Sequence, residues 1–377
     1  MSTQFISGND AFAAGILLAK PAVISAYPIT PQTVVVERLS EYVADGLLPD
    51  AQFIHVESEH SALSCAMGAS AAGVRTFTAT SSQGLLYMAE CLPYAAGGRF
   101  PIVMMNANRA LALPWNIYGD QSDSLSQLSC GWIQAYAENA QESLDLALMA
   151  FRIAEDTRVS VPFMVNLDGF HLTHTYEPVE VPEQALADKF LPEFVTDNKL
   201  DFAKPVNMAF SAGPGHNKRF RIGHHNAMLR AFDVIAETER DFAEIFGRSY
   251  SGALDAYRTD DADYVLVTLG SVSGLARTVA DELRDEGVRA GVLRVRYVRP
   301  FPGKEIAAIL AGKRVAVLEK DLAAGRGGAL FTEVASVSPN ASLSVIGGLG
   351  GEDISAGAIR GIFETLRREP ETEVLYL

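Results

Sequence analysis

The segment AVISAYPITPQTVVVERLSEYVADG, residues 22–46, joins two different patterns of hydrophobic residues. Its first six residues are apolar or small, as in a buried strand, whereas the apolar residues of 33–46 recur at every third or fourth position, as on one face of a helix. Between the two patterns, Pro28 and Pro31 fix two backbone φ angles and favour extended backbone at the residues before them. The segment therefore predicts a strand, a rigid turn and a helix.

The rest of the first half continues in the same way. Further buried strands are expected at 52–56, 74–80, 101–107 and 161–168, and helices at 33–46, 58–73, 83–97 and 140–157. Strands and helices in alternation predict an α/β fold with a parallel sheet that helices cover on both faces. In such sheets, ligands bind beyond the carboxyl ends of the strands.

The alternation stops between about residue 182 and residue 260. This segment is rich in proline, glycine and basic residues and ends in a charged helix near 230–248. It carries too many aromatic residues to be left in water, so we expect a connector that packs across a neighbour. The alternation then resumes, with strands expected at 263–271, 289–300, 314–321 and 343–350 and helices at 274–287 and 303–312. We therefore expect one domain over 1–240, including the connector from about 182, and a smaller α/β domain over 260–377.

Charge and composition exclude several classes of function. The 377 residues carry a formal net charge of −15, which repels phosphate backbones and anionic lipid and argues against nucleic-acid or membrane-surface binding. No apolar run approaches the roughly 20 residues that span a bilayer, and the first residues lack the pattern of a signal peptide. A cytoplasmic globular protein is expected.

Metal ligands are not expected in this chain. Cys65, Cys91 and Cys130 form no C-x-x-C motif, so buried free thiols are favoured over a disulfide or an iron–sulfur site. His171 and His174 come closest to the spacing of metal ligands, but they lack a partnered carboxylate pattern.

Thr30 lies between the two prolines of the opening turn. Because the prolines stiffen this turn, its shape should not depend on a ligand, and the Thr30 side chain would be held ready to contact one. A second interpretation makes Pro31 the first residue of the helix and Thr30 its N-cap. An N-cap at the carboxyl end of a strand would still face the ligand crevice, so both interpretations stay open.

Two carboxylates, Glu57 and Glu59, lie in or beside the first turn of the helix expected over 58–73. The helix dipole alone explains acidic residues at such positions. The same helix is rich in alanine, serine and glycine, which would let another backbone or a flat ligand approach closely. A carboxyl group at the edge of such a dry contact is suited to sharing a proton.

Arg109 follows the strand expected at 101–107 and enters a loop that contains Trp115. An arginine there can bind a carboxylate through two parallel hydrogen bonds, and aromatic neighbours would exclude water. The alternative is a structural salt bridge to Asp120 or Asp123.

Three glycine clusters, at 213–219, 325–330 and 347–353, are expected to form turns, because none is a phosphate-binding or dinucleotide motif. The segment VTLGSVSG, residues 267–274, comes nearest to a dinucleotide loop but lacks the paired glycines.

Six motifs, taken in order, resemble one family. They are YPITPQT (27–33), SEHSA (58–62), TSSQG (80–84), NRALALPWNIYGDQSD (108–123), NLDGFHLTH (166–174) and GLGGED (348–353). Over almost its whole length the chain resembles the alpha subunit of the multi-subunit 2-oxoacid:ferredoxin oxidoreductases of the pyruvate:ferredoxin oxidoreductase type. The resemblance implies a pyrimidine-type thiamine-diphosphate-binding domain, followed by a domain similar to the transketolase C-terminal module, as VLVTLGSVSGLARTVADEL (265–283) suggests.

The resemblance also implies roles for particular residues. Glu59 would bond the aminopyrimidine ring of thiamine diphosphate and assist its activation. Thr30 would hydrogen-bond the keto or carboxylate oxygens of a 2-oxoacid, and Arg109 would pair with its carboxylate. The remaining implied contacts are Pro28, Ile29 and Ser82 at the cofactor and Trp115 at the substrate.

Partner subunits follow from what the chain lacks. It has no G-D-G motif to begin a Mg²⁺ site, and three isolated cysteines cannot hold electron-transfer clusters. The resemblance therefore implies a beta-type subunit with the pyrophosphate and Mg²⁺ half of the site and a [4Fe-4S] cluster. It further implies ferredoxin-like and gamma-type subunits, coenzyme A as co-substrate, and ferredoxin, or NAD through a flavin subunit, as acceptor.

The substrate and two other functional classes stay open. Residues 211–225 differ from the pattern expected of pyruvate-type members, and LPWNIYG (113–119) is bulky where a substrate side chain would lie, so a branched-chain or aryl 2-oxoacid such as phenylglyoxylate competes with pyruvate. A non-catalytic scaffold subunit is disfavoured by the joint presence of Thr30, Glu59 and Arg109. A nicotinamide-dependent dehydrogenase is disfavoured by the missing dinucleotide motif.

Overall fold

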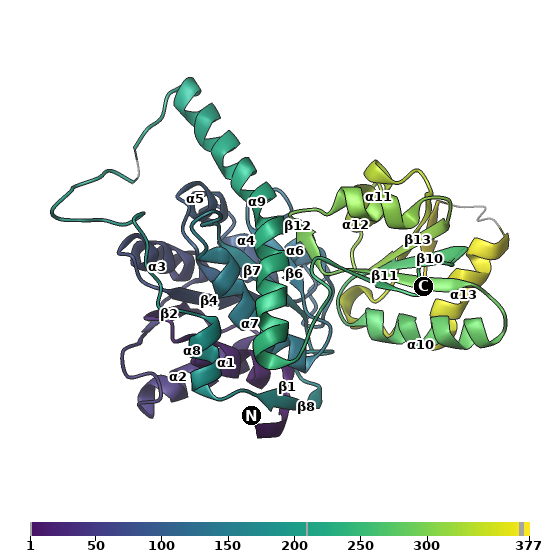
Figure 1. Ribbon diagram of the computed structural model, residues 1–377, viewed down its shortest axis with the longest axis horizontal. Helices are drawn as coiled ribbons and strands as arrows, with labels where there is room; N and C mark the ends of the chain where they lie inside the picture. Colours follow the sequence, from purple (N-terminus) through teal and green to yellow (C-terminus); the bar gives the residue numbers. More distant parts are fainter. Residues whose placement is uncertain (1, 209, 369–372) are drawn as a thin grey trace.

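The computed structural model describes residues 2–208, 210–368 and 373–377, which form two open sheets with helices on both faces (Figure 1). The first sheet has the order β12-β6-β7-β5-β4-β2-β3 within these ranges, and all its strands except β12 run parallel. The strands are β2 (Val23–Ala26), β3 (Gln52–His55), β4 (Thr76–Thr80), β5 (Val103–Asn108), β6 (Ile133–Tyr136), β7 (Phe163–Asp168) and β12 (Tyr297–Arg299).

Alternating side chains explain why helices cover both faces of this sheet. In β5, Val103 and Met105 belong to one buried cluster while Met104 belongs to another, because successive side chains of a strand point to opposite faces. The first cluster lies under α1 (Gly8–Ala19), α2 (Thr33–Ala44) and α7 (Ala140–Ala154), and the second under α3 (Glu59–Ala71), α4 (Ser82–Tyr87) and α5 (Cys91–Gly97). The predicted parallel sheet with two helical layers is confirmed.

Several elements of the first half differ from the prediction. The helix expected over 83–97 is two helices, α4 and α5, with a break at 88–90. Pro93 has no N–H to donate to the preceding turn, so a continuous helix would lose a hydrogen bond there. Strand β6 and the short helix α6 (Ser122–Leu125) were not predicted from the sequence.

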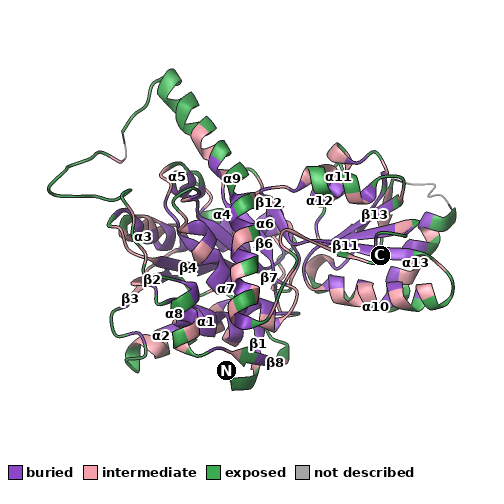
Figure 2. Ribbon diagram, in the orientation of Figure 1, coloured by how far each residue is buried: buried purple, intermediate pink, exposed green. Residues whose placement is uncertain are grey.

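The N-terminal strand β1 (Ser2–Ser7) pairs antiparallel with β8 (Tyr176–Val181), and α8 (Gln184–Phe190) follows. The long helix α9 (Pro214–Phe246) then crosses the first domain, and its second half packs against α7 through Val234 and Phe242 among others. Its first half projects from the body (Figure 1) and is exposed (Figure 2). The turn predicted at 213–219 is wrong: Gly213 is the N-cap and Pro214 the first residue of α9.

The second sheet has the order β15-β14-β13-β10-β11-β9 in the described residues, and only β9 is antiparallel. Helices α10 (Val272–Asp285) and α13 (Ala356–Arg368) cover one face, and α11 (Gly303–Leu310) and α12 (Ala329–Val337) cover the other. A 3₁₀ turn, η1 (Leu349–Gly351), follows β14. The strands are β9 (Leu254–Tyr257), β10 (Tyr264–Thr268), β11 (Ala290–Val295), β13 (Arg314–Glu319), β14 (Ala341–Ile346) and β15 (Val374–Tyr376).

The strand expected over 289–300 belongs to two sheets. Its first part, β11, pairs with β10, while its last part, β12, leaves the second sheet and pairs antiparallel with β6 of the first. A chain segment that follows the second domain's strand β11 thus completes the edge of the first sheet. The domain boundary expected between residues 240 and 260 stays a prediction. Strand β12 lies beyond that boundary in the sequence but belongs to the sheet of the first domain.

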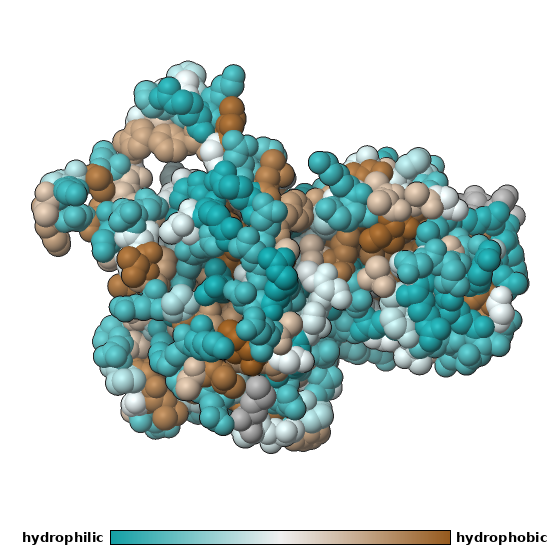
Figure 3. Space-filling view, in the orientation of Figure 1, coloured by the Kyte–Doolittle hydropathy of each residue, from teal (hydrophilic) through white to brown (hydrophobic). Residues whose placement is uncertain are grey.

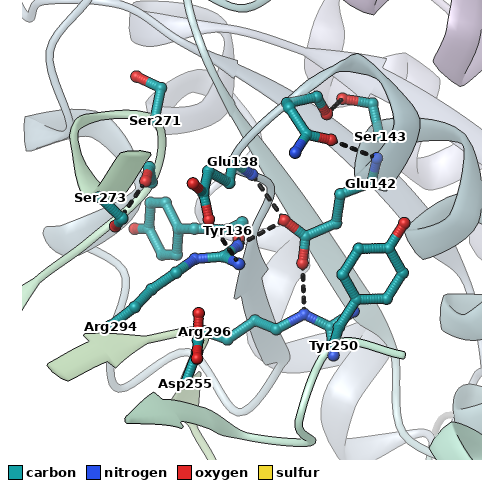
Figure 4. Close-up of polar contacts among 12 residues, drawn as sticks. Tyr136, Glu138, Glu142, Ser143, Tyr250, Asp255, Ser271, Ser273, Arg294 and Arg296 are labelled. Atoms are coloured by element: carbon teal, nitrogen blue, oxygen red, sulfur yellow. Dashed lines mark hydrogen bonds and ion pairs between the residues drawn. The ribbon is translucent and has the colours of Figure 1, made fainter. Parts of the chain in front are cut away.

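A buried cluster of charges joins the two domains at the same place (Figure 4). The Glu142 carboxylate, in the first turn of α7, accepts from Arg294 Nη2 and from Arg296 Nε, each at 2.5 Å. Arg296 also pairs with Glu239 of α9, and Arg294 pairs with Glu138. Since Glu142 and Arg296 are fully buried, this network fixes the second domain against the first.

Within the described ranges, none of the helices combines the length and the apolar character needed to span a bilayer. These residues also contain no group of three or more His, Cys, Asp or Glu side chains suited to a metal ion. His174 instead bonds the Thr173 hydroxyl at 2.8 Å and stacks on Phe170. Cys91 is buried, and Cys65 and Cys130 are partly buried; all three are free thiols.

Candidate active site

The candidate residues gather at the carboxyl edge of the first sheet. From β2 the chain moves to β3 on one side, and it later returns to β4 on the other, so the strand order reverses next to β2. Ligands of open α/β sheets bind at such a switch point. The loops there carry Thr30 after β2, Glu59 after β3, Ser82 after β4 and Arg109 after β5.

Gln32 holds the proline turn onto the sheet. Its fully buried side chain donates through Nε2 to the Tyr27 carbonyl at 2.9 Å and the Ala79 carbonyl at 3.2 Å. Helix α2 begins only at Thr33, with Gln32 as N-cap, so the interpretation of Thr30 as an N-cap is wrong. Thr30 and Pro28 are exposed and Ile29 is partly exposed, which leaves the turn accessible from the crevice.

Glu59 is a buried carboxylate at the first position of α3. The Ser58 hydroxyl caps this helix by accepting from the Ser61 N–H at 3.2 Å, so the cap does not use Glu59. The Glu59 side chain is 7% exposed, and the described residues offer its carboxylate no hydrogen bond. Glu57, by contrast, is bonded to the Ser61 hydroxyl and lies on the outer side. Of the two carboxylates considered, Glu59 is therefore the buried one and Glu57 the exposed one.

Gly84 makes room for this carboxylate. A Cβ atom at Gly84 would lie 2.5 Å from Glu59 Oε1 and 2.6 Å from the Thr80 hydroxyl, so any side chain there would displace one of the two. The Thr80 hydroxyl is buried and also lacks a described partner. Two polar groups without partners therefore meet beside a glycine, where burial would be costly unless a ligand bonds them.

Arg109 is bound to carbonyl oxygens. Its Nη1 donates to the Thr30 carbonyl at 2.9 Å and its Nε to the Asn116 carbonyl at 3.1 Å, and its guanidinium lies 5.8 Å from the Trp115 ring centre. No ion pair to Asp120 or Asp123 is found among the described contacts, so the predicted alternative of a salt bridge is wrong. Arg109 thus ties the turn after β2 to the loop after β5, and its guanidinium makes no direct ion pair among the described contacts.

Asn116 connects this loop to the second domain. Its Nδ2 donates to the Gly350 carbonyl of η1 at 2.9 Å, and its Oδ1 accepts from the Tyr118 N–H at 2.6 Å. The Gly350 N–H in turn donates to Asp120 at 3.3 Å. The glycine cluster at 347–353 is a turn, as predicted, and it supports the loop that carries Arg109.

Asp123 organises the centre of the site, although it was predicted from the sequence only as an alternative partner of Arg109. It is fully buried, and burial raises the pKa of this carboxyl to about 6. Two asparagines in an otherwise apolar strand, at 106 and 108, were the sequence signal that a buried acceptor lies nearby. Its donors are the N–H groups of Ser82 (3.0 Å), Arg109 (3.1 Å) and Ser124 (2.7 Å) and the amides of Asn106 (3.2 Å) and Asn108 (2.8 Å).

Ser82 lies in the same network. Its N–H donates to Asp123, and its hydroxyl donates to the Ala110 carbonyl at 2.6 Å, with a left-handed backbone at φ 51°. The loops after β4 and β5 are therefore locked together by Ser82 and Asp123. A direct contact of Ser82 with a cofactor stays a prediction.

The rim of the site is exposed and apolar. Leu113 and Trp115 lie on the loop after β5, with 88% and 71% of their surface exposed; Tyr27, on the loop after β2, and Tyr87, at the end of α4, are also exposed. Aromatic side chains at this density on a surface are typical of a contact between proteins.

Comparisons with known proteins support this picture. Residues 14–240 match the family description "Pyruvate flavodoxin/ferredoxin oxidoreductase, thiamine diP-bdg", and residues 262–359 match "Pyruvate:ferredoxin oxidoreductase core domain II". The chain is 47% identical to the pyruvate synthase subunit PorA of Methanothermobacter thermautotrophicus, over 100% of this chain and 98% of that protein. It is 43% identical to the ketoisovalerate oxidoreductase subunit VorA of Pyrococcus abyssi, over 98% and 94%.

Two solved structures share the fold. The 2-oxoglutarate:ferredoxin oxidoreductase from Magnetococcus marinus has a TM-score of 0.79 at 20% identity, over 97% of this chain and 65% of that one. A split-gene transketolase has a TM-score of 0.51 at 12% identity, over 96% and 98%. The family matches and the identity to whole relatives lead to one assignment: the chain belongs to the pyruvate-type 2-oxoacid:ferredoxin oxidoreductases, as their alpha subunit.

Proposed function

We propose that this chain is the catalytic alpha subunit of a complex that oxidatively decarboxylates pyruvate to its acyl-coenzyme A, with electrons leaving through partner subunits. The observation that carries the proposal is the pair of unbonded groups, Glu59 and Thr80, beside Gly84 at the switch point of the first sheet. The relatives named pyruvate synthase support the substrate, and the thiamine-diphosphate family match supports the cofactor.

The residues present fit thiamine diphosphate. A buried carboxylate without a partner, facing a space that only glycine leaves open, suits the ring nitrogen of an aminopyrimidine. When bound, the cofactor supplies the nucleophilic carbon and the electron sink for decarboxylation. Glu59 would hold a proton shared with the ring, Pro28 and Ile29 would line the ring's pocket, and Ser82 would keep the loop after β4 in place.

The 2-oxoacid would lie between the proline turn and the loop after β5. The Arg109 guanidinium lies over the Trp115 ring without a direct ion pair among the described contacts, and it would pair with the substrate carboxylate. The Thr30 hydroxyl, exposed on a turn that Gln32 and Arg109 hold in place, would donate to a substrate oxygen. Because these groups are fixed before the substrate binds, little ordering is needed at the moment of reaction.

A beta-type subunit would close the site. The apolar rim around Leu113 and Trp115 is a surface for it to cover, and the subunit would bring the Mg²⁺ and pyrophosphate half together with a [4Fe-4S] cluster. Ferredoxin-like and gamma-type subunits would carry electrons to ferredoxin. An additional flavin subunit would direct them to NAD instead. A scaffold role is disfavoured, since a scaffold has no use for an unbonded buried carboxylate.

The test uses the purified complex. Pyruvate, 2-ketoisovalerate and phenylglyoxylate are compared with coenzyme A and a viologen dye, and pyruvate is expected to give the highest kcat/KM. A preference for 2-ketoisovalerate would favour the second candidate, a branched-chain enzyme, which the 43% identity to VorA supports. An active complex without thiamine would overturn the proposal.

A further inference from the structure

Asp123 is a charged residue in the interior of a protein whose surface is mostly polar. The face of the molecule in Figure 3 is largely hydrophilic, drawn in teal, whereas Asp123 is fully buried in α6. The described contacts give its carboxylate no ion pair, only hydrogen bonds from five N–H groups. A buried carboxylate is costly unless its partners compensate for the lost water. What those donors hold in place therefore indicates why the charge is retained.

A single oxygen atom of Asp123 joins the loops on the two sides of the site. Its Oδ2 accepts from the Ser82 N–H at 3.0 Å, at the start of α4, and from the Arg109 N–H at 3.1 Å, after β5. Gly84, which leaves room for the Glu59 carboxylate, lies in the first turn of the same helix α4. A shift of Oδ2 would therefore disturb the surroundings of the cofactor carboxylate and of the substrate arginine together.

Only the ionised carboxylate fits these surroundings. The third donor to Oδ2 is Asn106 Nδ2 at 3.2 Å, and Oδ1 accepts from Asn108 Nδ2 at 2.8 Å and the Ser124 N–H at 2.7 Å. Because all five partners donate, a proton on either oxygen would displace at least one of them. Turning an amide over would break a second bond, since Asn106 also donates to Asn166 Oδ1 at 3.2 Å and Asn108 to Ser124 Oγ at 2.7 Å.

We propose that Asp123 is a positioning residue for both halves of the site and that its charged form sets the lower pH limit of the enzyme. The inference rests on the proposed function, because it concerns the thiamine and the 2-oxoacid halves of that site. Protonation would release a donor of the loop after β4 or of the loop after β5, so retention of cofactor and affinity for substrate would fall together. Burial raises the pKa of this carboxyl to about 6, which brings the limit into a measurable range.

The other titratable or charged groups around Asp123 have to be distinguished from it. They are Asp120 on the same segment, Arg109 after β5, Tyr136 in β6, Tyr87 at the exposed end of α4 and Lys320 of the second domain, which faces Asp120. Burial raises the pKa of Tyr136 well above its usual value, so this side chain stays neutral. Burial also raises the pKa of Asp120, which makes Asp120 the competing group.

The test measures kcat/KM for the 2-oxoacid and retention of thiamine diphosphate by the assembled complex between pH 5 and pH 8. The natural complex should lose both below about pH 6. Asp123→Asn keeps one acceptor oxygen for the loops but loses the charge, so KM at neutral pH should rise about tenfold and the decline at low pH should disappear. The same decline in Asp123→Asn would overturn the inference. A natural complex without thiamine-dependent activity would instead overturn the proposed function.

Two neighbouring variants should move the decline in opposite directions. Asn108→Ala removes a donor that stabilises the charged form, so the decline should move up by about one pH unit. Asp120→Asn removes a repelling charge and should move it down by less than that. Asn340→Ala, which removes an amide bond in the second domain, is the control and should leave it in place. A decline that neither variant moves, or that Asp120→Asn abolishes, would contradict the assignment to Asp123.

Unfolding of the free chain gives a measurement that does not depend on activity or on assembly of the complex. Because burial raises the pKa of Asp123 from 3.8 to about 6, the folded chain binds this proton more tightly than the unfolded chain between these values. The free energy of unfolding of the natural chain should therefore rise relative to that of Asp123→Asn as the pH falls from 7 to 4. A constant difference between the two chains over this range would overturn the inference.

Discussion

Two buried glutamates begin two helices of the first domain, at the first and the third helical position, and have opposite surroundings. Glu59 lies in the first turn of α3 and Glu142 in the first turn of α7, and both follow a strand of the first sheet. Glu142 accepts from Arg294 and Arg296 and is capped by Asn139, whereas Glu59 has no described partner. Glu142 lies where the domains meet, and Glu59 lies at the switch point, where ligands bind.

The hydrogen-bond partners of a buried carboxylate indicate whether it serves the structure or a ligand. A carboxylate with every oxygen paired contributes to a fixed structure, and removing it leaves its partners unpaired. A carboxylate with no partner costs stability as it stands, and it is retained only if a ligand completes it. The two residues should therefore respond in opposite ways to the same substitution.

Glu59→Gln should produce the largest effect, on activity alone. Without a carboxylate to share a proton, turnover in the assembled complex should fall roughly 10²- to 10⁴-fold. The free energy of unfolding should stay the same or rise, because no described hydrogen bond is lost. Thiamine retention, steady-state rates and urea unfolding measure these outcomes. Near-normal turnover would mean that another acid assists the cofactor.

Glu142→Gln should produce the reverse result. Arg294 and Arg296 would lose the carboxylate that they share and would each keep a single one, Glu138 and Glu239 respectively, at a cost of up to roughly 3–5 kcal/mol. The urea midpoint of the full chain should fall accordingly, while substrate affinity in complexes that still assemble stays near normal. Glu305→Gln, on the surface helix α11, is the control. An unchanged midpoint would show that the network does not join the domains.

Acid should weaken the joint between the domains only at low pH. Burial alone would raise the pKa of Glu142, but Arg294 and Arg296 outweigh burial and hold the pKa below its usual value of 4.5. The stabilisation is therefore present above pH 4.5 and is lost as the pH falls through the lowered pKa of the folded state. Unfolding free energy measured from pH 7 to pH 3 should decline more steeply for the natural chain than for Glu142→Gln. Parallel curves would contradict this.

Arg109→Ala should raise KM for the 2-oxoacid roughly 10- to 100-fold, the usual range for a hydrogen bond to a charged group, with a smaller change in kcat. Arg109→Lys keeps the charge but loses the two-pronged geometry, so an intermediate KM is expected. An unchanged KM in both variants would place the substrate carboxylate elsewhere.

Asn116→Ala should have the smallest effect. It removes the bonds to Gly350 and the Tyr118 N–H but leaves the carbonyl that Arg109 binds, so KM should rise only about 2- to 10-fold. Asn340→Ala, which removes an amide bond to the Leu310 carbonyl far from the site, is the control and should leave KM unchanged.

Much of the fold could be predicted because local pattern and final environment agree. Strands β2, β4, β5 and β7 are almost entirely buried and consist mainly of apolar or β-branched residues, and sequence patterns detect such strands well. Strand β6 has only four residues and includes Gln134, so its pattern was too short to separate from a loop. The start of α9 was missed because glycine and proline at 213–215 are typical of turns as well as helix beginnings.

The sequence predicted those site residues whose position in the sheet follows from the neighbouring strand alone. Arg109 stands directly after β5 and Glu59 begins the helix that follows β3, and the carboxyl ends of the strands meet at one edge of a parallel sheet. Asp123 was not predicted as the organising residue, because its five donors come from segments 1 to 41 residues away. Convergence of that kind depends on tertiary packing, which the spacing of residues in the sequence does not encode.

Strand β12 makes it difficult to express the first domain as a separate fragment. A fragment that stops near residue 250 would lack Tyr297–Arg299, and the backbone of β6 would then present its free N–H and C=O groups to solvent. Such a fragment should be recovered mainly as insoluble material, and supplying a peptide that contains residues 295–300 during refolding should rescue part of it.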